Sequence, residues 1–286
     1  MSRITCSMLG SVLAVAALVA LPAEAVCAET DPWREVFAGS EQLAQTDDPL
    51  VCILTIQHPD LIRKQLADKP VDQYSGLKLR RRVEESTGLR CLLVHFTELE
   101  GSDLDRPNVK AILITGRSKL VGPEHDRRFY PLIRETRIPI FGFCGGMQLI
   151  SQAFSAEVVP LRKLREGEAD PNPGYHPGQF KEWGYTPVRI VRRDPLFEGL
   201  PDEIVVREAH AFHVAETPAE FDLLASTAEC PVQAIKHRTR PVYGTQFHPE
   251  VHDDDHPHGR VVVENFFRLA GLAAGNRRCR GLPVRR

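Results

Sequence analysis

The 286-residue sequence lacks an excess of charge of either sign, because 36 lysines and arginines stand against 38 aspartates and glutamates. A nearly neutral chain exerts no global attraction on nucleic acid or anionic lipid. We therefore expect no nucleic acid as a partner. The sequence also lacks any Cys-x-x-Cys pair, which excludes a zinc ribbon.

Internal repeats and low-complexity tracts are absent as well, which excludes solenoid and fibrous architectures. The chain has no P-loop or other nucleotide-binding motif, so we expect no cofactor. What is present is typical of a soluble globular protein, with 42% hydrophobic residues. The length suffices for one large α/β domain or two small ones.

Near the N-terminus there is an apolar run that is too short to span a membrane comfortably. Arg3 precedes the apolar stretch Met8–Leu21, and Ala23-Glu-Ala25 has the small-x-small pattern of a cleavage site, with Val26-Cys-Ala28 as a second candidate. This order predicts a signal peptide over residues 1–28. A transmembrane anchor is the alternative, but no strong charged stop follows the run. We expect a periplasmic or secreted protein with no stable membrane span after cleavage.

Export changes how the seven cysteines are interpreted. Cys6 and Cys27 would be lost with the signal peptide, and the bulky Val26 disfavours acylation of Cys27. An odd number then remains in an oxidising compartment, so one cysteine stays unpaired or pairs between chains. The pairing of the others stays open, with Cys52–Cys91 as one candidate because both lie in predicted strands. The remaining cysteines are Cys52, Cys91, Cys144, Cys230 and Cys279.

The central stretch Ile138–Gln148 carries the strongest chemical signal. An apolar strand ends at Phe143, Cys144 follows between glycines, and an apolar helical stripe begins at Met147. This is the pattern of a nucleophile elbow with cysteine in place of serine. The helix N-terminus would lower the pKa of the thiol and offer backbone N–H groups to an oxyanion. The alternative is a buried structural cysteine in an ordinary strand-to-helix turn.

Strands and helices alternate before and after this elbow, which predicts an α/β fold. We expect an open, mostly parallel, twisted sheet with helices on both faces and an antiparallel extension after the elbow helix. Residues 162–179 are rich in proline, glycine and charge and are predicted to be an excursion over the surface. The predicted parallel strands are 50–56, 89–96, 109–115 and 138–143. The predicted shorter strands are 186–191, 203–208, 212–215, 223–226, 232–236 and 242–247. The predicted helices are 74–87, 129–136, 147–154 and 259–272.

Outside these elements, the domain organisation is simple. Residues 29–49 are predicted to be a linker with one short helix around Trp33–Ala44, and residues 50–271 a single domain. Residues 272–286 form a basic tail that is expected to be solvated.

A cysteine nucleophile requires a base and a group that orients the base. His248 stands at the end of a predicted strand, and Pro249 favours an extended conformation there. Residues two apart in an extended chain face the same way, so Glu250 is placed to hold the imidazole. Gly116 ends a parallel strand on the side where strand ends line one crevice. The N–H groups of Gly116 and Gly145 are therefore the candidate oxyanion donors. The alternative for His248 is a surface histidine in a proline turn.

The segments Phe141–Gln148 and Tyr243–Val251 together resemble the class I (triad) glutamine amidotransferases. Residues 196–201, 209–214 and 223–227 are similar to the glutaminase module of GMP synthetase in particular. The resemblance spans about Leu50–Gly271 and implies a flavodoxin-like fold acting on glutamine or a γ-glutamyl compound, with an unidentified synthase as a partner. It implies that Cys144 is the nucleophile, His248 the base and acid, and Glu250 the orienting carboxylate. By the same resemblance, Gly116 and Gly145 bind the oxyanion, and the substrate contacts are Gln148, Trp183, Gly184 and Tyr185.

The sequence departs from the family pattern at several places. Thr115-Gly116-Arg117 replaces the usual Gly-Gly-Pro, Gly146 stands where many relatives carry a bulkier residue, and Ala209-His-Ala211 replaces a Ser-His-Gly type of stretch. Family members are typically cytoplasmic and pass ammonia to a second active site, which differs from the predicted export. Three functions therefore remain open: an exported γ-carboxamide hydrolase, a γ-glutamyl peptide or conjugate hydrolase, and a catalytically silent binding module.

One further cluster, His252–His258, contains three histidines and three aspartates. Its spacing fits no helix face, and such runs are usually solvated loops. We expect no metal there, although imidazoles and carboxylates are common metal ligands.

Overall fold

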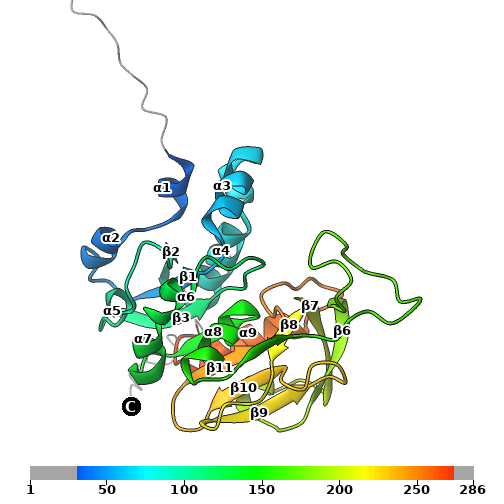
Figure 1. The fold of residues 1–286 in the computed structure, drawn as a ribbon. Coiled ribbons are helices and arrows are strands. Elements are labelled where there is room, and N and C mark those ends of the chain that lie inside the picture. The colour runs from blue at the N-terminus through cyan, green and yellow to red at the C-terminus, as the bar shows by residue number, and fades with distance from the viewer. Residues whose placement is uncertain (1–30, 274–286) are drawn as a thin grey trace, which may run out of the picture. The chain divides into compact units, whose positions relative to one another are not determined.

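The computed structural model describes residues 31–273. The predicted signal peptide lies outside this range, as does nearly all of the basic tail. A nine-stranded sheet in the order β2-β1-β3-β4-β11-β10-β9-β6-β7 forms the centre of the described part (Figure 1). In this part of the chain, no helix has the length and apolar character needed to cross a membrane.

Half of the sheet is parallel, as the apolar runs predict. The neighbouring strands are paired in parallel throughout: β2 with β1, β1 with β3, β3 with β4, and β4 with β11. Every residue of β1 is buried, which is typical of a strand covered by helices on both faces. These strands are β1 (Leu50–Thr55), β2 (Arg90–His95), β3 (Val109–Ile114), β4 (Ile140–Phe143) and β11 (Val242–Thr245).

The other half of the sheet is antiparallel, which confirms the predicted extension. β10 joins it to β11, and β9, β6 and β7 follow. The strand predicted from residue 186 begins earlier, so Trp183 lies inside it. A separate pair, β5 with β8, is also antiparallel. These strands are β5 (Val158–Pro160), β6 (Glu182–Ile190), β7 (Glu203–His210), β8 (Phe212–Val214), β9 (Phe221–Ser226) and β10 (Ala234–His237).

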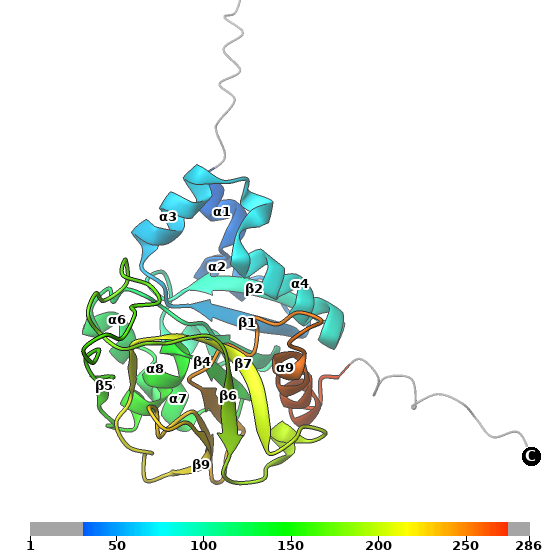
Figure 2. The ribbon, with the colours of Figure 1, turned by 90° about the vertical axis from the view of Figure 1, so that its right-hand side faces the viewer.

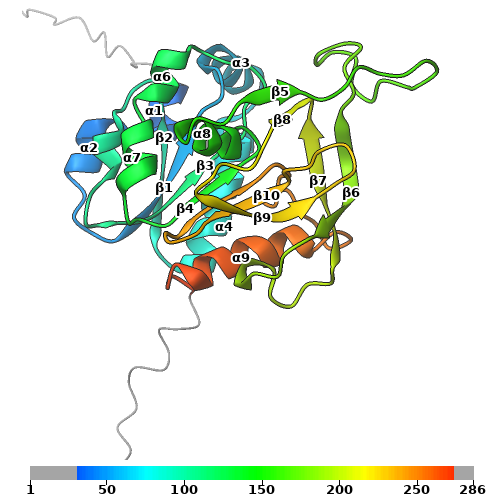
Figure 3. The same ribbon diagram turned by 60° about the horizontal axis from the view of Figure 1, so that its bottom comes forward.

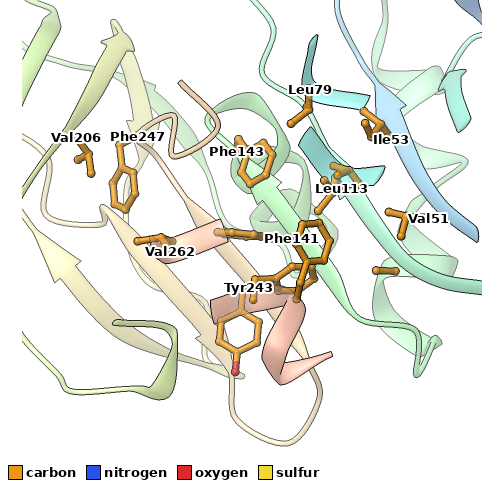
Figure 4. Packing of buried hydrophobic residues seen from close by; sticks show 14 of the residues in the cluster. Val51, Ile53, Leu79, Leu113, Phe141, Phe143, Val206, Tyr243, Phe247 and Val262 are labelled. Carbon is orange, nitrogen blue, oxygen red and sulfur yellow. The ribbon is translucent and has the colours of Figure 1, made fainter. Parts of the chain in front are cut away.

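Two clusters of buried apolar side chains lie on opposite faces of the sheet. Val51 and Ile53 of β1 belong to one cluster, and Leu50 and Leu54 to the other, as the alternation of side chains along a strand requires. The first cluster includes side chains of α1, α3, α4 and α9, and the second includes side chains of α2, α5, α7 and α8. Figures 2 and 3 show helices on the two faces, and Figure 4 shows part of the first cluster.

The helices follow the predicted pattern with two differences. The single helix expected over 33–44 is two short helices, because Phe37 is extended and the Ala38 N–H donates to the Leu93 carbonyl at 2.8 Å. Helices α3, α5 and α6 were not predicted. The helices are α1 (Pro32–Val36), α2 (Ser40–Ala44), α3 (Pro59–Asp68), α4 (Ser75–Thr87), α5 (Gly101–Leu104), α6 (Pro123–Arg127), α7 (Tyr130–Glu135), α8 (Gly145–Ala153) and α9 (His258–Leu269), with 3-10 turns η1 (Val71–Gln73) and η2 (Pro195–Phe197).

The candidate disulfide between Cys52 and Cys91 is wrong. The two residues do lie on paired strands, since Val51 is opposite Cys91. Their side chains point to opposite faces of the sheet, however, as their places in the two different apolar clusters show. Both are free and buried, as is Cys230.

Candidate active site

Cys144 occupies a strained turn between β4 and α8. Its backbone has φ 48° and ψ −106°, a region that non-glycine residues rarely adopt and that often marks a functional site. The turn is held from two sides, since the Cys144 N–H donates to the Thr245 carbonyl at 2.7 Å and its own carbonyl accepts from the Gln148 N–H at 3.0 Å. The predicted nucleophile elbow is therefore present.

The glycines around Cys144 allow α8 to approach the sheet closely. A Cβ on Gly146 would lie 2.2 Å from the Ile114 carbonyl oxygen, and one on Gly142 would lie 2.5 Å from the Gly146 carbonyl carbon. Both distances are far below van der Waals contact, so neither position accepts a side chain unless the helix moves. The close packing of α8 against β3 therefore explains why this chain has glycine at position 146, where many relatives carry a bulkier residue.

His248 and Glu250 form the predicted pair beside the sulfur. His248 follows β11, and its backbone N–H donates to the Arg207 carbonyl at 2.8 Å, which holds the segment against β7. The His248 Nδ1 lies 2.7 Å from Glu250 Oε1. His248 and Cys144 are neighbours, because a Cβ built on Gly116 would lie 2.9 Å from His248 Cε1 and 3.4 Å from Cys144 Cβ. Sulfur, imidazole and carboxylate are therefore contiguous, in the order that a nucleophile, its base and an orienting group require.

The charges around His248 favour its protonated form. Burial alone would lower the pKa of the imidazole, but the Glu250 carboxylate and Cys144 outweigh burial and raise that pKa well above its ordinary value. At neutral pH the residue therefore holds a proton beside the sulfur. That proton is available to a leaving nitrogen.

The predicted oxyanion glycines also lie at the sulfur. A Cβ on Gly116 would meet His248 Cε1 at 2.9 Å and Cys144 Cβ at 3.4 Å, so only glycine fits between them. Gly145 opens α8, where the first-turn N–H groups have no acceptor within the helix. A Cβ on Gly145 would lie 2.9 Å from the Arg117 backbone nitrogen, so the loop after β3 and the start of α8 converge.

The unusual Arg117 is not a free charge in the site. Its guanidinium forms two hydrogen bonds to Asp126, at 2.6 and 2.8 Å. The two side chains are 5% and 8% exposed, so the pair is buried. Arg117 therefore fixes the oxyanion loop against α6.

The predicted substrate contacts are only partly brought together. Trp183 lines the same cleft as Cys144 and His248, but Gln148, Gly184 and Tyr185 do not. The Gln148 amide donates to the Phe212 carbonyl at 3.1 Å and to Gln246 Oε1 at 3.2 Å. The Tyr185 ring stacks on His256 at 3.7 Å. The Gln246 amide in turn donates to Cys144 Sγ at 3.4 Å, so Gln148 is connected to the sulfur through one side chain. The substrate contacts of Gln148 and Tyr185 stay predictions.

Gly184 has a structural reason for its identity. Its φ is 105°, a backbone conformation that is strained for any residue with a side chain. A Cβ built on Gly184 would have the Arg207 guanidinium as its nearest contact. Glycine at this position shapes β6, and its contact with substrate stays a prediction.

The cleft contains residues that the sequence did not single out. It has a volume of about 810 Å³. Gln57 follows the carboxyl end of β1, so the rule that identified Gly116 would have found it too. No comparable signal marked Tyr175, which lies in the stretch predicted to be a surface excursion. The unpredicted lining residues include Gln57, Tyr74, Ser118, Asn172 and Tyr175.

Two groups of potential metal ligands have other partners. In the 252–258 loop, His256 lies 2.9 Å from Asp253 and stacks on Tyr185. Elsewhere, ligand atoms of Glu182, His210 and Cys230 lie within 4.8 Å of one another. His210 Nε2 lies between Glu182 and Glu208, at 3.0 and 3.1 Å. Burial lowers the pKa of His210, but these carboxylates raise it to about 10.

Known proteins match this arrangement over most of the chain. The sequence model of the family Glutamine amidotransferase class-I matches residues 71–270. A glutamine-hydrolyzing GMP synthase subunit from Pyrococcus abyssi is 31% identical over 180 residues, which cover 63% of this chain and 85% of that protein. The corresponding GMP synthase subunit from Thermoplasma acidophilum is 34% identical over 174 residues, covering 60% of this chain and 76% of that protein.

A solved structure agrees with these sequence matches. The crystal structure of a putative GMP synthase subunit from Thermoplasma acidophilum superposes with a TM-score of 0.58 and 26% identity, over 82% of this chain and 98% of that one. The α/β fold and the family resemblance predicted from the sequence are thereby confirmed. The chain belongs to the class-I glutamine amidotransferase family.

Proposed function

We propose that the protein hydrolyses the γ-carboxamide of glutamine or of a related amide, with Cys144 as nucleophile, His248 as acid and base, and Glu250 as the orienting carboxylate. One observation carries this proposal. The His248 imidazole is held at 2.7 Å by Glu250 and lies beside Cys144, in a cleft that all three residues line together with Gly116. Relatives whose names describe glutamine hydrolysis support the same chemistry.

The proposed reaction has two steps. The Cys144 sulfur attacks the γ-carbonyl carbon, and the oxygen accepts hydrogen bonds from the N–H groups of Gly116 and Gly145. The carbon–nitrogen bond then breaks, His248 gives its proton to the nitrogen, and ammonia leaves a γ-glutamyl thioester. Water attacks the thioester while His248 accepts a proton, the carbon–sulfur bond breaks, and glutamate leaves. Each oxyanion donor contributes about 10²- to 10³-fold in rate in enzymes of this type.

We also propose that the protein works outside the cytoplasm, on the basis of the signal-like residues 1–28. The buried cysteines are compatible with that location. Burial raises the pKa of Cys52 to about 12 and raises the pKa values of Cys91 and Cys230 as well. A buried, protonated thiol reacts slowly with oxidants. Because the relatives are named as subunits of a synthase, an unidentified synthase is the second partner we propose.

The test of the activity is the release of ammonia from glutamine by the full chain. Wild-type protein should release ammonia, Cys144→Ala should not, and mass spectrometry should find a γ-glutamyl adduct on Cys144. Cys91→Ala is the matched control, because that thiol is also buried but lies in β2 away from the cleft. A protein that neither hydrolyses any γ-glutamyl amide nor forms the adduct would be a binding module, and the proposal would fail.

A further inference from the structure

The segment Arg162–Lys181, which we call the strap, joins β5 to β6 and is cross-linked at its base. The Arg162 guanidinium makes two hydrogen bonds to Glu168, both at 2.7 Å, and two to Glu229, both at 2.9 Å. It also lies 4.0 Å from the centre of the Phe180 ring. Such paired, charge-assisted bonds fix geometry more strongly than single surface ion pairs do. Figure 3 shows the strap running beyond the ends of β5 and β6.

A second anchor fixes the middle of the strap. The Lys181 side chain has no exposed surface, and its Nζ lies 2.7 Å from Asp170 Oδ1. Asp170 also accepts from the backbone N–H groups of Asn172 and Gly178, at 3.0 and 3.2 Å. A buried cation is stable only when it is fully paired. The strap is therefore a cross-linked excursion over the surface, in which the side chains of residues 162–180 are exposed or half-buried.

These anchors direct one side chain back toward the active site. His176 has φ 47°, and its ring packs 4.8 Å from Phe212. Its neighbour Tyr175 contacts the His176 ring at 4.4 Å and lies 6.4 Å from the Trp183 ring. Tyr175 thereby lines the cleft together with Cys144. Burial, with a smaller contribution from Cys144, raises the pKa of Tyr175 to about 12, so the phenol near the sulfur is a hydrogen-bond donor at neutral pH.

The cleft around Tyr175 is large and has aromatic walls. Its volume of about 810 Å³ lies toward the upper end of the range of about 300–1,000 Å³ found for sites that bind drug-sized ligands. Tyr74, Tyr175 and Trp183 line it from three different parts of the chain. Ile62 adds an apolar wall from α3, which precedes the region matched by the family model. Free glutamine would leave most of these apolar surfaces in contact with water.

We propose that Tyr175 contacts the substrate and that the strap adapts the site to γ-glutamyl amides whose amine carries an aromatic or other large apolar group. This inference rests on the proposed function, because Cys144 remains the nucleophile. The carbon–nitrogen bond of the amide breaks, His248 protonates the nitrogen, and the amine leaves in place of ammonia. Water then releases glutamate from Cys144, so one water is consumed for each amide cleaved.

The experiment compares glutamine with γ-glutamyl-p-nitroanilide as substrates of the full chain. Wild-type protein should have a kcat/KM for the anilide at least about 10-fold above that for glutamine. Tyr175→Ala should lower the value for the anilide by about 10-fold, mainly through KM, and should change that for glutamine much less. Asp170→Asn, which weakens the ion pair with Lys181, should also lower kcat/KM for the anilide. Tyr130→Phe is the control, because Tyr130 lies on α7 outside the cleft.

Binding supplies a readout that does not require turnover. Calorimetric titration of Cys144→Ala with the anilide should give a Kd that rises about 10-fold when Tyr175→Ala is added. A preference for glutamine over the anilide, or a Tyr175→Ala effect of equal size on both substrates, would overturn the inference while leaving the hydrolase intact. If neither compound is cleaved and Cys144 forms no adduct, the proposed function fails together with the inference.

Discussion

The substitution Glu250→Gln tests how the charge of one carboxylate sets the protonation of His248. Glu250 Oε1 lies 2.7 Å from His248 Nδ1, and no group within residues 31–273 forms a hydrogen bond with Glu250 Oε2. The carboxylate therefore acts mainly on the imidazole. Glutamine keeps the size of the side chain and removes its charge. The backbone should stay in place, because Arg82 donates to the Glu250 carbonyl at 2.6 Å.

The expected magnitude follows from what the carboxylate does. It raises the pKa of His248, so the wild-type imidazolium should persist above the ordinary range of histidine and be lost as the pH rises through the folded-state pKa. Without the charge, the pKa falls, and the alkaline limb of the pH–rate profile moves to lower pH. The amide can also stabilise the wrong tautomer. Together these effects should lower kcat by about 10²- to 10⁴-fold.

The assay is ammonia release from glutamine at saturating substrate between about pH 5 and 10, a range that spans the titration of histidine. Glu198→Gln is the control, because Glu198 forms an exposed ion pair with Arg268 outside the cleft. An alkaline limb that stays in place in Glu250→Gln would show that Glu250 does not set the charge of His248. A fall in kcat of less than about 3-fold would refute its role as the orienting group.

Other predictions address the elbow and the loop beside it. Gly146→Ala should lower the free energy of unfolding in urea by about 1–3 kcal/mol, because the new Cβ would lie 2.2 Å from a carbonyl oxygen. Gly174→Ala is the control and should change stability little, because the atom nearest to its Cβ would be 3.5 Å away. Arg117→Ala should lower the free energy of unfolding by about 3–5 kcal/mol, because it leaves Asp126 buried and unpaired. A loss below about 1 kcal/mol, which is typical of surface ion pairs, would contradict this prediction. A protein of residues 31–273 should present Cys144 alone to an alkylating reagent that is specific for thiols, because Cys144 lines the cleft and the other three thiols are fully buried. Modification of the other thiols before unfolding would show that their burial is incomplete.

The parts of the site that the sequence predicts are those fixed by local rules. The elbow at Cys144 depends on glycine spacing and on a strand-to-helix turn, and the His248–Glu250 pair depends on the alternation of an extended chain. Gly116 follows from the common edge of parallel strand ends. Each rule needs only a few neighbouring residues, and the structure brings all four residues together.

The parts that escape prediction depend on contacts between distant residues. The strap turns toward the cleft because Arg162 pairs with Glu229, 67 residues away. The Gln148 amide is held by Phe212 and by Gln246, which are 64 and 98 residues away in the sequence. Composition indicates that residues 162–179 are polar, but it does not determine which long-range partners they meet. The Cys52–Cys91 pairing fails for another reason: both cysteines lie in strands as predicted, but the register of the two strands places their side chains on opposite faces of the sheet.

Strand β11 connects the nucleophile mechanically to its base. The Thr245 carbonyl accepts from the Cys144 N–H at 2.7 Å, and the same strand continues into His248. β11 is also the last strand of the parallel half and pairs with the first antiparallel strand, β10. A change in the twist between the two halves of the sheet would therefore displace sulfur and imidazole as one unit. The distance between sulfur and imidazole should therefore change little under such a deformation. The distance between Gly116 and Tyr175 of the strap should change.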